Sequence, residues 1–320
     1  MRIGLIDVDG HNFPNLPLMK LSAWHKAQGD SVEWYEPLFS GHMDIVYMSK
    51  VFSFTDDYQW CIDADKIVKG GTGYAIKKIN GREVYRKEND LELPEEIEHI
   101  YPDYSIYPEL TQNTAYGFLS LGCPRGCIFC HVACKEGKKS RKVADLKEFW
   151  NGQKEIKLLD PNILACNEAL DLLQQLADSG AWVDITQGLD ARLLNDKNIE
   201  VIKQIKIKMI HFAWDQPKDE PHIVPKLKLF KEKTGINKRK AIVYVLTNFD
   251  STLEEDLHRV YTIRDLGMAP YIMIYDKEHA GKEAKDLARW VNNRIIWYAD
   301  ETATFEDYRG DSKRQRRREK

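Results

Sequence analysis

The sequence predicts an α/β protein in which a partial (β/α)6 barrel of the TIM type follows a small Rossmann-like α/β domain. From about residue 155, short apolar segments alternate with amphipathic segments of helical periodicity. The apolar segments begin about 30 residues apart, which is the length of one βα unit. Residues 1–90 contain a second, shorter series of strand and helix patterns. Right-handed crossovers between such units build parallel sheets.

Residues 1–90 form the predicted Rossmann-like domain. Its expected elements are strands over 2–8, 31–37, 44–52 and 65–74 and a helix over 18–29. The fourth strand runs into Gly70-Gly71-Thr72-Gly73. Glycines allow close backbone approach, so this segment predicts either contact with a nucleotide tail or a simple turn of the chain.

Residues 114–300 form the predicted barrel. The expected strands are 115–121, 155–159, 182–186, 209–214, 241–246 and 271–275, with a last strand-like segment over 294–300. Most are apolar throughout, as in sheets that are covered on both faces. Helices are expected over 167–180, 252–267 and 281–293, and Thr252 with Glu255 forms a capping-box pattern. Because six units are fewer than the eight of a closed barrel, the barrel is predicted to be partial.

Two segments lack these patterns. Residues 91–113 contain Pro94, Pro102 and Pro108 and are predicted to be a linker. Residues 301–320 end in KRQRRREK, with six basic residues and one acidic residue. Such a run is usually a disordered, solvated end, and a phosphate-binding arm is the alternative.

The composition indicates an ordinary globular protein. Hydrophobic residues make up 43% and charged residues 30% of the chain, and the net charge is −3. Contact with nucleic acid would therefore depend on a local basic patch such as the tail. No apolar run reaches the 18–20 residues of a membrane span, and charged residues interrupt the N-terminal segment, so we expect a cytoplasmic protein.

Four of the six cysteines lie within residues 123–134, directly after the strand 115–121. Cys123, Cys127 and Cys130 have the spacing Cys-x3-Cys-x2-Cys on a loop rich in Gly and Pro. Three thiolates on one tight loop can hold three irons of a 4Fe-4S cluster and leave the fourth iron open to a small molecule. Phe129 is expected to form an apolar wall beside that iron. The alternative is a structural zinc site with Cys134 or His131 as fourth ligand.

This motif resembles that of the radical S-adenosylmethionine superfamily, and the resemblance covers about residues 114–300. It implies an enzyme in which the open iron binds the amino and carboxylate groups of S-adenosylmethionine. One electron, from a partner such as flavodoxin or ferredoxin, would cleave the sulfonium to methionine and a 5′-deoxyadenosyl radical, which abstracts hydrogen from an unidentified substrate. The cofactor supplies this chemistry, and the protein supplies orientation and shielding.

The resemblance also implies that polar residues at the carboxyl ends of the strands bind the cofactor. They are Asp160, Asn162, Gln187, Asp190, Arg192, Asp215 and Asn248. The Gly-Gly-Glu that the superfamily carries after the second strand is replaced by Asp160-Pro161-Asn162. Helix capping is the alternative role for residues such as Asn162. No catalytic residue is assigned, and Cys61, Cys134 and Cys166 are expected to be free thiols.

A Rossmann-like domain before this core resembles the cobalamin-binding subclass. Asp9 and His11 match its Asp-x-His pair, but Pro14 stands where that motif has glycine. The sequence therefore favours a degenerate domain that serves substrate recognition or packing. Two alternative functions remain, a cobalamin-dependent radical methyltransferase and a non-catalytic, zinc-stabilised module that binds nucleic acid.

Overall fold

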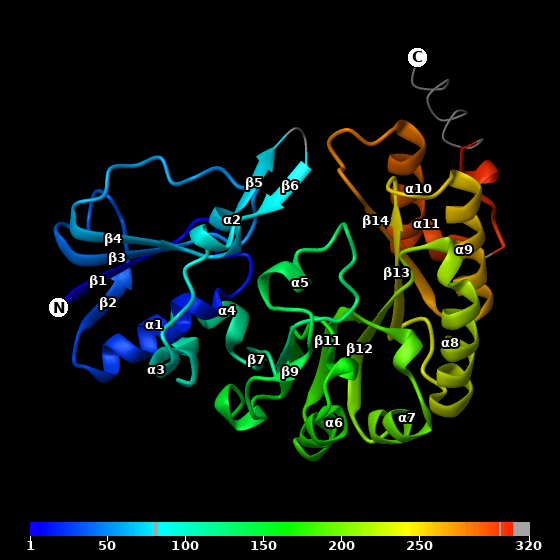
Figure 1. Cartoon of the computed structure of the whole chain (residues 1–320), viewed down its shortest axis with the longest axis horizontal. Coiled ribbons are helices and arrows are strands. Elements are labelled where there is room, and N and C mark those ends of the chain that lie inside the picture. Colours follow the sequence, from blue (N-terminus) through cyan, green and yellow to red (C-terminus); the bar gives the residue numbers. More distant parts are fainter. Residues whose placement is uncertain (80–81, 301, 310–320) are drawn as a thin grey trace. The chain divides into compact units, whose positions relative to one another are not determined.

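A computed structural model describes residues 1–79, 82–300 and 302–309 (Figure 1). The basic segment 313–320 lies outside these residues. The chain divides into two compact units, residues 1–159 with 166–168, and residues 160–165 with 169 onward. Both contain parallel sheets, which confirms the predicted α/β class. Among the described helices, none combines the length and apolar character that a membrane crossing requires.

The first unit consists of short strands with few long helices. Its strands are β1 (Arg2–Asp7), β2 (Ser31–Trp34), β3 (Met43–Ser49), β4 (Ala64–Gly70), β5 (Ile76–Ile79), β6 (Arg82–Tyr85), β7 (Thr114–Gly117), β8 (Ser120–Leu121), β9 (Arg141–Lys142) and β10 (Glu155–Leu158). Its helices are α1 (Leu16–Ala27), α2 (Thr72–Ala75), α3 (Glu95–Glu98), α4 (Pro108–Thr111) and α5 (Val132–Lys135), with 3₁₀ turns η1 (Lys87–Asn89), η2 (Tyr104–Ile106) and η3 (Leu146–Glu148).

The N-terminal sheet of this unit has the order β2-β1-β3-β4, with all strands parallel. Helix α1 begins at Asn15, whose side chain accepts a hydrogen bond from the Leu18 N–H. Leu18 and Leu21 of α1 pack against Ile3 and Leu5 of β1. Burial of these apolar side chains fixes the helix on the sheet.

Three further strand pairings lie in the first unit. Strands β5 and β6 form an antiparallel hairpin, β7 pairs with β10 in parallel, and β8 pairs with β9 in antiparallel fashion. The connecting segment 91–113 contains α3, η2 and α4, and its Ile97 and Tyr107 are buried. The cysteine motif lies between β8 and β9.

The second unit alternates strands and helices. Its strands are β11 (Trp182–Leu189), β12 (Lys206–Ala213), β13 (Ala241–Thr247) and β14 (Ala269–Ile274). Its helices are α6 (Ala169–Asp178), α7 (Asp196–Ile202), α8 (Glu220–Thr234), α9 (Leu253–Asp265), α10 (Lys282–Asn292) and α11 (Arg294–Ala299), with 3₁₀ turns η4 (Ile163–Ala165), η5 (Ala191–Leu193) and η6 (Pro217–Asp219).

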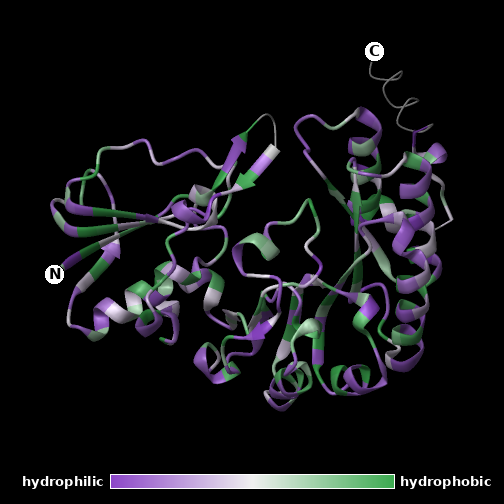
Figure 2. Cartoon of the chain, viewed as in Figure 1, coloured by the Kyte–Doolittle hydropathy of each residue, from purple (hydrophilic) through white to green (hydrophobic). Residues whose placement is uncertain are grey.

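The four strands of the second unit are parallel in the order β14-β13-β12-β11. Helix α9 packs against β13 and β14, and the central strands are hydrophobic whereas α8 and α9 carry hydrophilic stretches (Figure 2). The register of β11 against β12 shifts between Ile185 and Leu189. Such an irregularity changes the direction in which the side chains within it point, here those of residues 186–188.

The strand-like segment 294–300 is helical, which corrects its prediction. The side chain of Asn293 caps helix α11 by accepting hydrogen bonds from the N–H groups of Ile295 and Ile296. Trp297 is then buried with its ring 4.8 Å from that of Trp290 in α10. The cap and this aromatic contact therefore outweigh the β-propensity of the branched and aromatic residues.

Candidate functional site

The cysteine motif lies on a loop that the short β8–β9 pair closes at its base. Gly122 follows β8 with a φ of 89°, and a Cβ at this position would lie 2.3 Å from the Lys139 carbonyl oxygen. No other residue type fits both the left-handed backbone and this close approach. The glycine that the motif carries before Cys123 is thus explained by the closure of the loop on itself.

Hydrogen bonds across the loop hold its two arms together. The Cys123 N–H donates to the Gly137 carbonyl at 3.1 Å, and the Gly122 N–H donates to the Glu136 carboxylate at 2.9 Å. Arg141 donates to the Glu136 carbonyl at 2.6 Å. Within the motif, the Cys130 N–H donates to the Cys127 carbonyl at 3.0 Å. The backbone around the three cysteines is therefore ordered by the chain's own contacts.

The donor set of the loop is three thiols on one short segment, and Cys123, Cys127 and Cys130 are each partly buried. In a cubane cluster each of three thiolates can bind a different iron. A tetrahedral zinc would need a fourth protein ligand in addition to these three.

The other cysteines do not join this loop's motif. Cys61 and Cys134 are exposed, and Cys166 is buried. The Cys166 thiol donates to the Glu168 carboxylate at 3.1 Å. That Cys61, Cys134 and Cys166 are thiols without a metal role stays a prediction.

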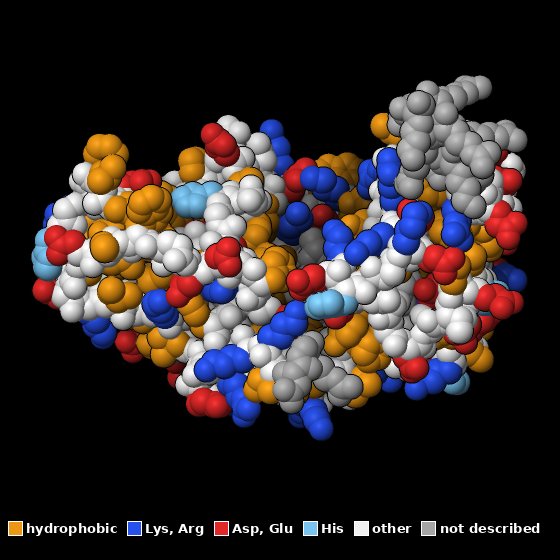
Figure 3. Space-filling model, turned by 90° about the horizontal axis from the view of Figure 1, so that it is seen from above, with side chains coloured by type: hydrophobic (Ala, Val, Ile, Leu, Met, Phe, Trp, Pro, Cys, Tyr) orange, Lys and Arg blue, Asp and Glu red, His pale blue; other side chains and the backbone are white. Residues whose placement is uncertain are grey.

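The loop between β3 and β4 is joined to the cysteine loop through Glu83 of the β5–β6 hairpin. The Ser53 hydroxyl donates to one carboxylate oxygen of Glu83, and His131 lies 3.3 Å from the other. Phe52 and Phe54 on this loop stack with ring centroids 5.1 Å apart, and Phe54 is 80% exposed. The space-filling view shows hydrophobic side chains open on this face of the first unit (Figure 3). No spacing pattern in the sequence predicts this contact, because its partners are 30 and 48 residues apart.

In the second unit, the predicted residues Asp190 and Arg192 form an ion-pair network with Asp219. Asp190 caps the turn η5, and its carboxylate accepts from the Arg192 Nε at 2.7 Å. The Arg192 Nη1 donates to Asp219 at 3.0 Å. Arg192 thus already faces two carboxylates of its own chain, which reduces the charge that it offers to a ligand carboxylate.

The carboxyl of Asp215, just after β12, has a raised pKa. Burial raises the pKa of Asp215 to about 6, although Arg259 and Arg192 act in the opposite direction. Arg259 is fully buried and donates to the Asp215 carbonyl at 2.9 Å and the Leu246 carbonyl at 2.9 Å. It therefore links the ends of β12 and β13. A carboxyl with this pKa exchanges protons near neutral pH.

The remaining predicted residues lie after β10, within β11 and after β13. Asp160 and Asn162 are buried directly after β10, and Gln187 is exposed at the register shift of β11. Asn248 has a φ of 61° and donates to the Tyr275 carbonyl at 2.8 Å. Phe129 lies with the cysteines in the first unit, whereas the polar residues belong to the second.

Arg259 and Asp219 were missed in the sequence. The signal for Arg259 was present, because Asp256, Arg259, Val260 and Ile263 all occupy the buried face of α9. Two charged residues at core positions of an amphipathic helix indicate an internal ion pair. Asp219 gave no comparable signal, since it lies in the 3₁₀ turn η6 before α8.

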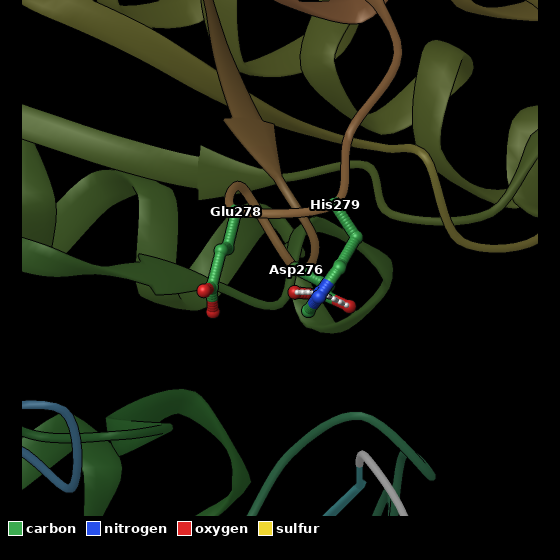
Figure 4. Close-up of side chains that lie close together, drawn as sticks. All are labelled: Asp276, Glu278 and His279. Atoms are coloured by element: carbon green, nitrogen blue, oxygen red, sulfur yellow. Dashed lines mark hydrogen bonds and ion pairs between the residues drawn. The ribbon is translucent and has the colours of Figure 1, made fainter.

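A group of possible metal ligands, also absent from the sequence predictions, follows β14. Asp276, Glu278 and His279 offer ligand atoms within 4.8 Å of one another (Figure 4). All three are exposed, and His279 Nδ1 already lies 2.9 Å from an Asp276 oxygen. Exposed groups of this kind are common without a metal, so the cluster by itself indicates no site.

Comparison with known proteins gives few matches. No family model matches the chain, and no curated protein matches it. Among solved structures, the chain is similar to SuiB of Streptococcus suis, with a TM-score of 0.41 and 12% identity over 58% of this chain and 46% of that one. A second SuiB structure, bound to S-adenosylmethionine, gives a TM-score of 0.40 and 11% identity over 58% of this chain and 47% of the other. The chain thus spans less than half of the proteins that it matches in structure, and this likeness is too weak to assign a family.

Proposed function

We propose that the protein is a radical S-adenosylmethionine enzyme that acts on an unidentified substrate. The observation that carries the proposal is the Cys-x3-Cys-x2-Cys motif on a loop that is closed and ordered by its own hydrogen bonds. Cys123, Cys127 and Cys130 would hold the 4Fe-4S cluster as thiolates. A bound cluster supplies the electron for cleavage of S-adenosylmethionine to methionine and a 5′-deoxyadenosyl radical.

The chain's own contribution in the first unit is to present three thiolates without a fourth protein ligand. Phe129 follows the exposed Ile128 within the motif and is partly buried. We assign Phe129 the role of an apolar wall that limits the access of water. Flavodoxin or ferredoxin is the proposed class of reducing partner.

In the second unit, we propose that the residues after the parallel strands bind the cofactor's amino acid and ribose groups. Ligands of parallel α/β sheets bind outside the carboxyl ends of the strands. Asp190 and Arg192 are paired with each other, which supports a revised role for Arg192, namely holding Asp190 and Asp219 in place. Asp160, Asn162, Gln187, Asp215 and Asn248 remain the proposed direct contacts.

The first experiment compares two cysteine variants after anaerobic reconstitution with iron and sulfide. The wild-type chain and Cys134→Ala should each bind about four irons and produce 5′-deoxyadenosine when reduced in the presence of S-adenosylmethionine. Cys127→Ala should lose most of the iron and all of the product, because only two thiolates remain. Iron content, the electron paramagnetic resonance spectrum and product chromatography measure these effects.

Cys134→Ala is the matched control, since it removes an exposed thiol seven residues beyond Cys127 and outside the motif. Equal loss of iron in both variants would assign Cys134 to the cluster and contradict the three-cysteine site. One zinc per chain without iron would support the structural zinc module instead.

A further inference from the structure

The ligand-binding position of the N-terminal sheet is identified by its strand order. In the order β2-β1-β3-β4, the chain reverses direction across the sheet between β1 and β3. In parallel α/β sheets, ligands enter the crevice outside the carboxyl ends of the two strands at such a switch point. Here the two strands end at Asp7 and Ser49, and helix α1 begins nearby at Asn15.

The side chain of Tyr107 already occupies this position. Tyr107 is only 3% exposed, and its hydroxyl donates to the Asp7 carboxylate at 2.7 Å. The N–H groups at a helix start commonly bind anions, and here the Leu18 N–H already donates to the Asn15 side chain at 3.3 Å.

Asn15 and Ser49 at the switch point are also engaged within the chain, whereas the second Asp7 carboxylate oxygen, Oδ1, is buried and makes none of the described hydrogen bonds. The Asn15 side-chain amide donates to the Ser49 hydroxyl at 2.9 Å. The Val8 N–H donates to the Ser49 carbonyl at 3.0 Å. A phosphate or corrin side chain would need to displace these contacts as well as Tyr107.

The residues that match the cobalamin motif have different partners in this fold. The Asp9 carboxylate accepts hydrogen bonds from the backbone of Val51 and Phe52. The His11 ring lies 4.2 Å from the Trp34 ring and 5.6 Å from the Tyr107 ring. Asp9 therefore holds the β3–β4 loop, and His11 packs on the aromatic residues that fill the crevice.

The glycines after β4 do not leave space for a nucleotide tail. A Cβ on Gly71 would lie 2.4 Å from the Lys50 carbonyl oxygen, and one on Gly73 would lie 2.7 Å from the Phe52 carbonyl oxygen. The Gly73 N–H donates to the Lys50 carbonyl at 2.9 Å. Their lack of a side chain is thus used for packing against the chain's own backbone.

We infer that the switch point of the N-terminal sheet is a closed joint filled by Tyr107, and that this domain binds no cobalamin. The joint instead anchors the segment that leads to β7. Trp34 donates to the Ile106 carbonyl at 3.2 Å, and the Tyr104 hydroxyl donates to the Phe149 carbonyl at 2.6 Å. The Tyr116 N–H in β7 donates to the Tyr104 hydroxyl at 3.1 Å. Residues 104–107 therefore connect the N-terminal sheet with the strand that precedes the cysteine loop.

The first test uses the full chain and hydroxocobalamin as the probe. After incubation and gel filtration, the absorbance spectrum measures how much corrin remains with the protein. The expected result is no retained corrin. Retention of about one corrin per chain would overturn the inference. Since neither iron nor S-adenosylmethionine is needed, the result is independent of the proposed radical chemistry.

The second test measures the anchoring role by hydrogen–deuterium exchange. Tyr107→Phe keeps the ring and removes the hydroxyl, so we expect amides of residues 104–111 to exchange about tenfold faster, the factor for loss of one buried hydrogen bond to a charged group. Tyr101→Phe, at a more exposed tyrosine of the same segment, should leave exchange unchanged. Unchanged exchange in Tyr107→Phe would overturn the closed joint.

Discussion

Asp7 is a carboxyl whose ionisation is altered by its surroundings. Burial raises the pKa of Asp7 to about 6, although the hydrogen bond from Tyr107 acts in the opposite direction. The folded chain therefore binds this proton more tightly than the unfolded chain does. It follows that ionisation of Asp7 costs free energy in the folded state only.

We expect the free energy of unfolding to fall as the pH rises from about 4 to about 6, with no further contribution from Asp7 above that. Asp7→Asn mimics the neutral carboxyl and should lack this part of the pH dependence. The difference in free energy of unfolding between the wild-type chain and Asp7→Asn should change by up to about 3 kcal/mol between about pH 4 and about pH 6. Urea unfolding at several pH values measures it, and parallel curves for both proteins would contradict the raised pKa.

Gly122 and Gly126 offer a matched pair of glycines on the cysteine loop. Both have positive φ, 89° and 58°, but a Cβ on Gly122 meets the Lys139 carbonyl whereas one on Gly126 meets nothing within 4 Å. Gly126→Ala should lower the free energy of unfolding by about 1 kcal/mol, through the strain of the left-handed backbone alone. Gly122→Ala should cost several times more and reduce iron uptake, because the loop cannot close. Similar unfolding midpoints and iron contents for the two variants would exclude loop closure as the role of Gly122.

At the scale of elements, helix α9 connects two strands of the second unit through one buried guanidinium. Arg259 pairs with Asp256 on its own helix and donates to carbonyls at the ends of β12 and β13. The sequence predicted this helix and its Thr252–Glu255 capping box, and both are confirmed. It did not predict the network, because the acceptors are backbone carbonyls in other elements.

Arg259→Met should therefore destabilise the protein by about 3–5 kcal/mol, since it leaves Asp256 buried without its partner. The double variant Arg259→Met with Asp256→Leu should recover part of this loss. Lys203→Met, which breaks an exposed pair with Glu200, should cost under about 1 kcal/mol. Denaturant unfolding compares the three. A loss for Arg259→Met no larger than that for Lys203→Met would show that the internal pair is not structural.

Some elements of the fold can be predicted from the sequence and others cannot, for physical reasons. Strands such as β10 and β13 are predicted to within a residue or two because continuous apolar runs identify buried parallel strands. The β5–β6 hairpin lacks such a run and was missed. Helix α11 was assigned as a strand, because local propensity carries no information on the Asn293 cap or the Trp290 contact.

For the molecule as a whole, the repeat pattern predicted the class of fold and the cysteine motif predicted the thiols of the proposed site. The contacts that organise these parts join residues far apart in the chain, such as Tyr107 with Asp7 and Glu83 with His131. Spacing patterns cannot reveal such pairs. The first unit therefore combines the N-terminal sheet and the cysteine loop, although their sequences look like separate segments.

The hydrogen bonds that close the cysteine loop have a consequence for how a metal would be taken up. Glu136 and Gly137 hold the start of the loop through hydrogen bonds of the polypeptide itself. Ordering a loop of this length costs conformational entropy, and here that cost falls on folding of the polypeptide. Assembly of a cluster then adds bonds to a backbone that is already in place, so iron and sulfide should enter the folded apoprotein without a refolding step.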